Sequence, residues 1–80
     1  MKALITVMPR REVLDPQGEA VRQGLASLGY EEVGAVRVGR IIEVELEAAS
    51  MEVAAARVTS MCEQLLANEV IEDFSFELVS

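Results

Sequence analysis

The sequence predicts an α+β fold of the ferredoxin-like kind, with the element order β-α-β-β-α-β. Apolar and polar residues alternate over residues 41–47 and 71–79, as in strands with one buried face. Apolar residues recur at helical spacing over 15–29 and 50–68. Helices of about 1.5 Å per residue and strands of about 3.3 Å per residue would then match in length. We therefore expect an antiparallel four-stranded sheet with two helices on one face, as a single domain over residues 1–80.

The first strand is expected over residues 3–8, a short apolar run rich in strand formers that ends at Pro9. The first helix should begin at Asp15 and Pro16. Asp accepts hydrogen bonds from unpaired helix amides, and Pro tolerates the first helical position. Three apolar residues then recur at helical spacing: Val21, Leu25 and Leu28. Gly29 predicts the end of this helix.

A β-hairpin is expected from residue 34 to residue 47, with its turn at Gly39-Arg40. Val36 and Val38 alternate with Arg37 before the turn. After the turn, three apolar residues alternate with three glutamates: Ile42, Val44 and Leu46 against Glu43, Glu45 and Glu47. The second strand should therefore have one buried and one polar face.

The second helix is expected to begin at Ser50, a good N-cap residue. Its apolar positions are Val53, Val58, Met61, Leu65 and Leu66. Asn68 is interpreted as a left-handed stop. The last strand should run over residues 71–79, with Phe74, Phe76 and Leu78 on one face and Asp73, Ser75 and Glu77 on the other.

The composition argues against a self-contained enzyme. The chain has no histidine, one cysteine and a single lysine at position 2, so the usual catalytic groups other than carboxylates are scarce. One cysteine forms no internal disulfide and, without histidine, no zinc or iron–sulfur site. A core built from 80 residues is marginal, and 51% of the residues are hydrophobic. We therefore expect self-association, as a dimer or a tetramer.

The net charge of −7 limits the possible partners. Nucleic acid is not expected as a partner, because its binding depends on lysine and arginine displacing counterions. No membrane association is expected, because anionic lipid would be repelled and no apolar run reaches about 18 residues. The N-terminus does not look like a signal peptide. A free cysteine without a partner suits a reducing compartment, so the expected location is cytoplasmic.

Three carboxylates and one thiol each allow a functional and a structural interpretation. Glu43, Glu45 and Glu47 could bind a hard cation such as magnesium, but a single row on one strand is more typical of a solvated face. Cys62 could act as a nucleophile, but no histidine is available to activate it. A packed thiol is the favoured interpretation. No metal, cofactor or catalytic residue is therefore assigned to this chain.

The few arginines offer a stronger candidate for recognition. Arg37 and Arg40 flank the expected hairpin tip, where a rigid scaffold can present side chains to a partner. They could bind a phosphate or an acidic partner, or they could be ordinary surface charge, and the same alternatives hold for Arg10-Arg11. The stretch 15–18 could turn helix amides toward an anion, although a plain helix cap is the simpler interpretation.

Three stretches of sequence together indicate a family. They are Val13-Leu14-Asp15-Pro16-Gln17-Gly18 with Ala20-Val21, then Val36-Arg37-Val38-Gly39-Arg40, then Met61-Cys62-Glu63-Gln64-Leu65-Leu66-Ala67-Asn68 running into Val70-Ile71-Glu72-Asp73-Phe74. In this order and spacing the chain closely resembles the PurS family, the small subunit of bacterial and archaeal formylglycinamide ribonucleotide amidotransferase. The resemblance covers nearly the full length. Glu69 stands where the family often has Pro, Phe74 where Tyr is frequent, and Arg40 where Lys is common.

The resemblance implies a role in the fourth step of purine biosynthesis. In that enzyme a glutaminase subunit releases ammonia, and a large synthetase subunit uses ATP and magnesium to activate formylglycinamide ribonucleotide. The small subunit is regarded as a non-catalytic bridge that holds the other two together and assists ammonia transfer. The resemblance therefore implies these two subunits as partners, in addition to self-association, and no cofactor bound by this chain.

The residues that we expect at the partner interface come from the matched stretches. They are Asp15, Pro16, Gln17, Gly18, Arg37, Gly39, Arg40 and Asn68. Because ammonia must travel unprotonated, the glutamate face of residues 43–47 should be a poor wall for a conduit. The alternative function is a small-molecule-sensing regulatory domain, which has the same element order.

Overall fold

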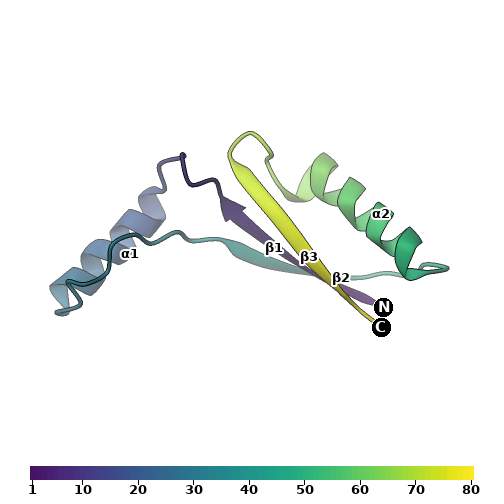
Figure 1. Ribbon diagram of the computed structural model, residues 1–80, viewed down its shortest axis with the longest axis horizontal. Coiled ribbons are helices and arrows are strands. Elements are labelled where there is room, and N and C mark those ends of the chain that lie inside the picture. The colour runs from purple at the N-terminus through teal and green to yellow at the C-terminus, as the bar shows by residue number, and fades with distance from the viewer.

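The computed structural model describes residues 1–80 as an α+β fold with an antiparallel sheet (Figure 1). Its elements are β1 (Lys2–Pro9), α1 (Pro16–Ser27), β2 (Arg40–Glu45), α2 (Met51–Met61), a π-helical turn η1 (Cys62–Leu66) and β3 (Glu72–Val79). The expected α+β class, the two helices and three of the four strands are confirmed. The fourth strand is wrong, because the sheet contains three strands.

The sheet has the order β2-β1-β3, and both pairings are antiparallel. Ile5 in the central strand lies opposite Ile42 of β2 and Phe76 of β3. The two outer strands each carry an unpaired edge. This order is what remains of a ferredoxin-like sheet when the strand expected before residue 39 is missing.

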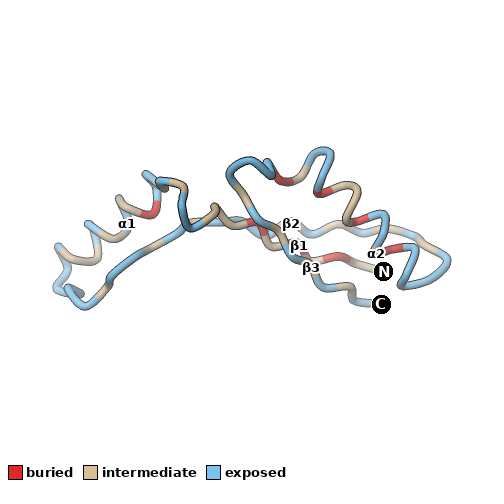
Figure 2. Tube along the Cα trace, turned by 45° about the horizontal axis from the view of Figure 1, so that its top comes forward, coloured by how far each residue is buried: buried red, intermediate tan, exposed pale blue.

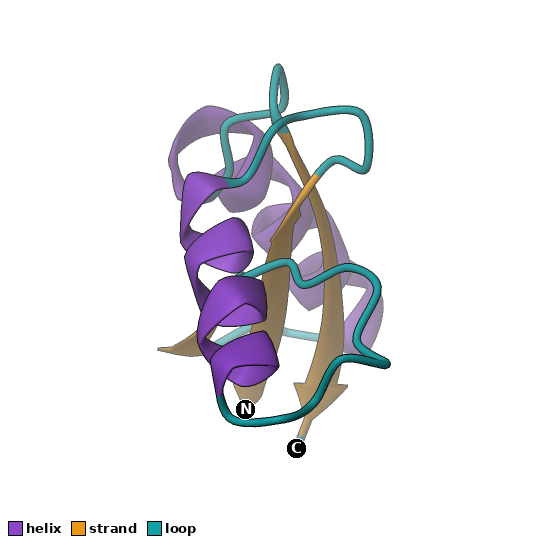
Figure 3. Cartoon of the chain, turned by 90° about the vertical axis from the view of Figure 1, so that its left-hand side faces the viewer, coloured by secondary structure: helices purple, strands orange, loops and turns teal.

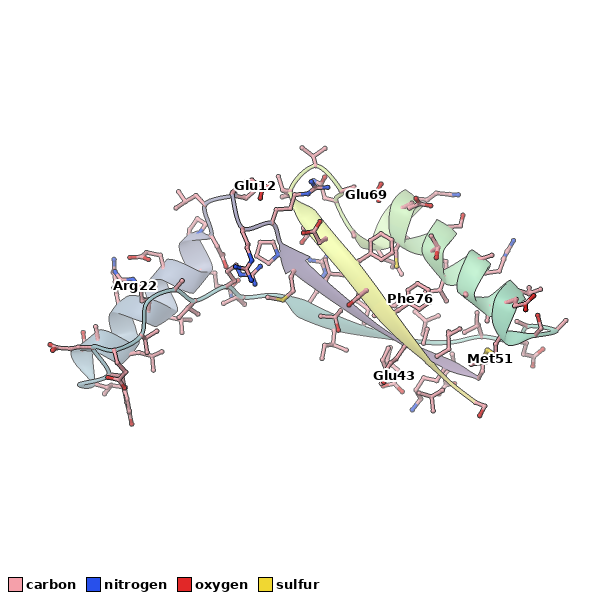
Figure 4. All side chains as sticks on the ribbon, viewed as in Figure 1. Glu12, Arg22, Glu43, Met51, Glu69 and Phe76 are labelled. Atoms are coloured by element: carbon pink, nitrogen blue, oxygen red, sulfur yellow. The ribbon has the colours of Figure 1, made fainter.

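One face of the sheet packs against α2 and η1. The buried side chains of β1 (Ala3, Ile5 and Val7) meet Val58 and Cys62 from the helical segment. Phe76 points toward α2, whereas Glu43 lies on the opposite face (Figure 4). Only eight of the 80 residues are buried, and seven of them belong to this layer of β1, α2, η1 and the residue after it (Figure 2). The hydrophobic core is therefore small even for a chain of this length.

The expected hairpin between residues 34 and 47 is not formed. Residues 34–38 belong to no helix or strand and pair with no strand, and the chain passes through Gly39 directly into β2. Gly39 does not provide a turn. A Cβ atom at this position would overlap the Val7 carbonyl and the Met8 sulfur, so the glycine allows the chain to pass close to β1.

Helix α1 does not cover the sheet, contrary to the expectation of two helices on one face. Residues 10–39, which we call the arm, carry α1 away from the sheet along the long axis of the molecule (Figure 1). Viewed along that axis, α1 lies in front of the sheet (Figure 3). The molecule measures 51 × 25 × 14 Å, and its radius of gyration is 16.0 Å. A compact domain of this length would have a radius of gyration of about 12 Å. The chain by itself is therefore markedly elongated.

The ends of the helices follow local chemistry. Ser50 caps α2 as expected, because its hydroxyl accepts a hydrogen bond from the Val53 amide at 3.1 Å. Gly29 has a φ of 103° and ends α1, as expected from the sequence. Asn68 is not left-handed, contrary to the prediction. Its side-chain oxygen instead accepts from the Val70 amide at 3.2 Å and shapes the loop before β3.

The lengths and hydropathies of the helices also bear on membrane insertion. Neither helix combines the length and the apolar composition that a membrane crossing would require.

Candidate partner-binding surface

The base of the arm is joined to the segment before β2 by a long-range hydrogen bond. Asp15 precedes α1, and its Oδ2 accepts from the Val38 amide at 2.8 Å. In the observed geometry its carboxylate makes no capping hydrogen bond to α1. This residue, expected as a simple helix cap, therefore ties the two chain segments that form the base of the arm.

Two further contacts fix the same region to the sheet. Arg37 Nη1 donates to the Pro9 carbonyl at 3.0 Å, where β1 ends. The Arg10 amide donates to the Ile71 carbonyl at 2.8 Å, which connects the start of the arm to the start of β3. The arm therefore leaves the sheet in a direction set by hydrogen bonds at its base, since α1 packs on no strand.

Arg40 forms an ion pair within the chain. Its Nη1 lies 2.6 Å from Glu72 Oε2, and its Nη2 donates to the Leu66 carbonyl at 2.7 Å. Glu72 Oε1 also accepts from the Asn68 amide at 2.8 Å. The Arg40 side chain is 48% exposed and the Glu72 side chain only 15%. This cluster joins the start of β2 to the loop between η1 and β3.

The electrostatics of these groups follow from their hydrogen bonds. The Arg40 guanidinium, and next the Asn68 amide, hold the pKa of Glu72 below its ordinary value. The hydrogen bond from the Val38 amide likewise lowers the pKa of Asp15, and the nearby Gly18 amide, which makes no capping hydrogen bond to this carboxylate, and the Arg37 charge add to this effect. Both carboxylates are therefore ionised at neutral pH.

The residues expected at the partner interface lie around this junction. A depression of about 410 Å³ is lined by Asp15, Pro16, Gln17, Gly39, Arg40 and Glu72. Arg37 lines a second depression of about 560 Å³, which Asp15 also borders. Asn68 adjoins the first depression through its hydrogen bond to Glu72. The structure thus brings into one region residues that are distant in sequence.

Two residues in this region have structural roles that the sequence did not suggest. Gly18 is buried, and a Cβ atom there would overlap the Val36 carbonyl, so its observed role is close packing of α1 on residues 34–38. Glu72 was not anticipated, although it lies next to Asn68 and pairs with Arg40. The sequence contained no local signal for it, because the pairing depends on β1 placing β2 and β3 on its two sides.

The structure brings together no other cluster of side chains suited to catalysis or metal binding. No group of three potential metal-ligating side chains comes together. The Cys62 thiol is buried, and this burial, followed by the charges of Glu63 and Glu69, raises its pKa. Glu43 lies 2.8 Å from Lys2 in an ion pair on the open face of the sheet.

Comparisons with known proteins agree on one family. The family model for PurS, described as phosphoribosylformylglycinamidine (FGAM) synthase, matches residues 2–80. A PurS subunit from Synechocystis is 49% identical over 76 residues, which cover 95% of this chain and 76% of that protein. The structure of Bacillus subtilis PurS is 42% identical with a TM-score of 0.85, and covers 99% of this chain and 98% of its own. A chain in the structure of PurLQS from Thermotoga maritima is 35% identical with a TM-score of 0.87. The chain belongs to the PurS family of phosphoribosylformylglycinamidine synthase subunits.

Proposed function

We propose that this chain is a non-catalytic subunit of phosphoribosylformylglycinamidine synthase, which joins the glutaminase and synthetase subunits in purine biosynthesis. The observation that carries the proposal is the match to a chain of PurLQS, which covers 98% of this chain and 95% of that one. The composition supports it, because histidine is absent and the only thiol is buried.

In this proposal the chemistry belongs to the partner subunits. The glutaminase releases ammonia, and the synthetase uses ATP and magnesium to convert formylglycinamide ribonucleotide to formylglycinamidine ribonucleotide. This chain binds no cofactor and assists ammonia transfer by holding the two active sites in a fixed relative position. It acts in the cytoplasm, where a free buried thiol persists.

The partner surface in this proposal is the junction between the arm and the sheet. Arg37 is exposed and carries a positive charge that the structure pairs with a carbonyl rather than a carboxylate. Such a guanidinium keeps donors free for an acidic group on a partner. Arg40 contributes less, because Glu72 already neutralises it. The open sheet face carries Glu43, Glu45 and Glu77, which makes it unsuited to conducting neutral ammonia.

Self-association, as a dimer or a tetramer, is part of the proposed function. The radius of gyration, the eight buried residues and the exposed apolar side chains of the arm all favour it. Leu14 and Leu28 are 82% and 76% exposed. Apolar surface of this kind is normally covered by another chain.

The decisive experiment compares two nitrogen donors. Synthesis of formylglycinamidine ribonucleotide by the partner subunits is measured with glutamine and with free ammonium, each with and without this chain. A bridge is required for the glutamine reaction and dispensable for the ammonium reaction. If neither reaction responds to the chain and no complex forms, the bridging function is wrong. Saturable stabilisation by an amino acid or a nucleotide would then favour a sensing domain.

A further inference from the structure

The outer edge of β3 is a long strand edge without a partner. The sheet order β2-β1-β3 leaves one side of β3 free, and its pairing with β1 is unbroken over all eight residues, Glu72–Val79. Natural edge strands are usually protected by shortness, lysine, proline or a bulge. The β3 strand is longer than β2, has no bulge and contains neither proline nor lysine. This edge is therefore open to a further strand.

Hydrogen bonds at the two ends of β1 show which side of the sheet each backbone group faces. Met1 and Leu46 exchange backbone hydrogen bonds, so the odd-numbered residues of β1 bond toward β2. The Arg10 amide donates to the Ile71 carbonyl, so the even-numbered residues bond toward β3. Bonded positions alternate along an antiparallel pair. On β3, the odd-numbered residues therefore bond to β1 and the even-numbered residues point outward.

The outward backbone groups on β3 are those of Glu72, Phe74, Phe76 and Leu78. The Glu72 amide is already paired, because it donates to the Asn68 carbonyl at 2.7 Å. The amides of Phe74, Phe76 and Leu78 face a side of β3 on which the sheet has no strand. Together with the outward carbonyls they form a row of donors and acceptors that an extended chain can pair with.

The side chains of β3 give this edge two different faces. On the α2 face, Phe74, Phe76 and Leu78 pack against the core but are only partly buried. On the open face, Asp73 and Glu77 are exposed. None of the ion pairs within the chain includes Glu77. Because opposed residues of paired strands point to the same face, a complementary strand alternates apolar side chains with lysine or arginine.

We propose that the outer edge of β3 binds an extended segment of a different protein chain, in which basic and apolar side chains alternate. The segment adds a strand to the sheet and accepts hydrogen bonds from the outward amides of β3. The inference rests on the proposed function, because a chain that joins two subunits needs two surfaces that do not overlap. The junction between the arm and the sheet is one such surface, and residues 74–78 lie outside it.

A second copy of this chain fits the β3 edge poorly. Two β3 edges paired antiparallel, with their apolar side chains on one face, would bring both acidic rows together on the other face. In each register that pairs most of the strand, Asp73 or Glu77 lies opposite or diagonal to a carboxylate of the other copy, where like charges repel. The net charge of −7 adds repulsion at longer range. Charge therefore favours a different, basic segment at this edge.

The first test measures amide hydrogen exchange, residue by residue, in the isolated chain and in its complex with the glutaminase and the synthetase. In the isolated chain the amides of Phe74, Phe76 and Leu78 should exchange fast, whereas those of Ser75 and Glu77 should exchange slowly. In the complex, exchange at the first three amides should slow many-fold. A partner that covered only side chains would not protect alternate amides in this way.

The second test examines the charge of the bound segment. Glu77→Lys should raise the dissociation constant of the complex several-fold, and this loss should become smaller at high salt. Glu63→Lys is the matched control, because it makes the same change in net charge at an exposed position of η1. Circular dichroism checks that both variants are folded.

Three results would overturn the inference. One is slow exchange at Phe74, Phe76 and Leu78 in the isolated chain, since a second copy would then occupy the edge. Another is fast exchange at these amides in the complex. The third is equal weakening of the complex by Glu77→Lys and Glu63→Lys. If glutamine-dependent synthesis still requires the chain in any of these cases, the inference about β3 alone fails. If no complex forms and that requirement is absent, the proposed function fails with it.

Discussion

The Val38 amide donates to the Asp15 carboxylate at 2.8 Å, although the two residues are 23 positions apart. This bond closes the base of the arm. It explains why an aspartate at a helix start makes no observed hydrogen bond to the helix that follows it.

Replacing Asp15 with alanine should loosen the arm without unfolding the sheet. The Val38 amide loses its acceptor, whereas Asp15 lies outside the hydrophobic core. Hydrogen exchange at Val38 and its neighbours should become faster, and exchange in β1 should stay unchanged. Asp15→Asn is the control, because an amide oxygen can still accept the bond. Equal exchange in the wild type and Asp15→Ala would show that the bond contributes nothing to the arm.

Gly18→Ala and Gly24→Ala should have opposite effects, although both lie in α1. A methyl group at position 18 would overlap the Val36 carbonyl, and such overpacking costs about 1–3 kcal/mol. Position 24 has no neighbouring atom within 4 Å of a Cβ. There, alanine should stabilise the helix by about 0.5–1 kcal/mol. Urea unfolding of both variants measures the difference, and a neutral Gly18→Ala would contradict the close packing of α1 on residues 34–38.

Acid should remove the contribution of the Arg40–Glu72 pair. The pKa of Glu72 is lowered in the folded state, so its contribution is complete above the unfolded pKa of about 4.3. That contribution is then lost as the pH falls through the folded pKa. At neutral pH Glu72→Gln should cost at most about 1 kcal/mol, because Arg40 is half exposed. The difference in unfolding free energy between wild type and variant should therefore shrink between pH 7 and pH 3. A difference that persists at pH 3 would point to packing rather than charge.

Charge reversal at Arg37 should weaken assembly with the partner subunits. Arg37→Glu places a carboxylate at the exposed junction, whereas Arg57→Glu makes the same change in charge on α2. Co-elution with the glutaminase and the synthetase should fall several-fold for the first variant and stay near wild type for the second. Circular dichroism checks that both variants are folded. Equal co-elution of the two variants would remove Arg37 from the partner surface.

The sequence predicted those parts of the fold that depend on local pattern. Alternation over residues 72–79 and the Ser50 cap correspond to β3 and the start of α2, because these signals act within a few residues. The absence of a turn at Gly39 could not be predicted. A glycine required for close approach to Val7 and Met8 has the same sequence signature as a glycine required for a turn.

The candidate site was likewise predictable only in part. Asp15, Arg37 and Arg40 were expected at the partner interface because they lie in the matched stretches, at a helix start and an expected hairpin tip, and the structure places them in one region. Their partners, the Val38 amide, the Pro9 carbonyl and Glu72, could not be predicted, since each depends on tertiary register. Alternation reveals which face of a strand is apolar. It does not reveal whether the neighbouring strand comes from the same molecule.

The elongated outline has a consequence for how this protein behaves in solution. A radius of gyration of 16.0 Å equals that of a compact domain of about 180 residues, more than twice the length of this chain. A single extended chain and a compact pair of chains would thus leave a sizing column at nearly the same volume. Retention time would therefore not give the number of chains, and only a method sensitive to mass could distinguish one chain from two.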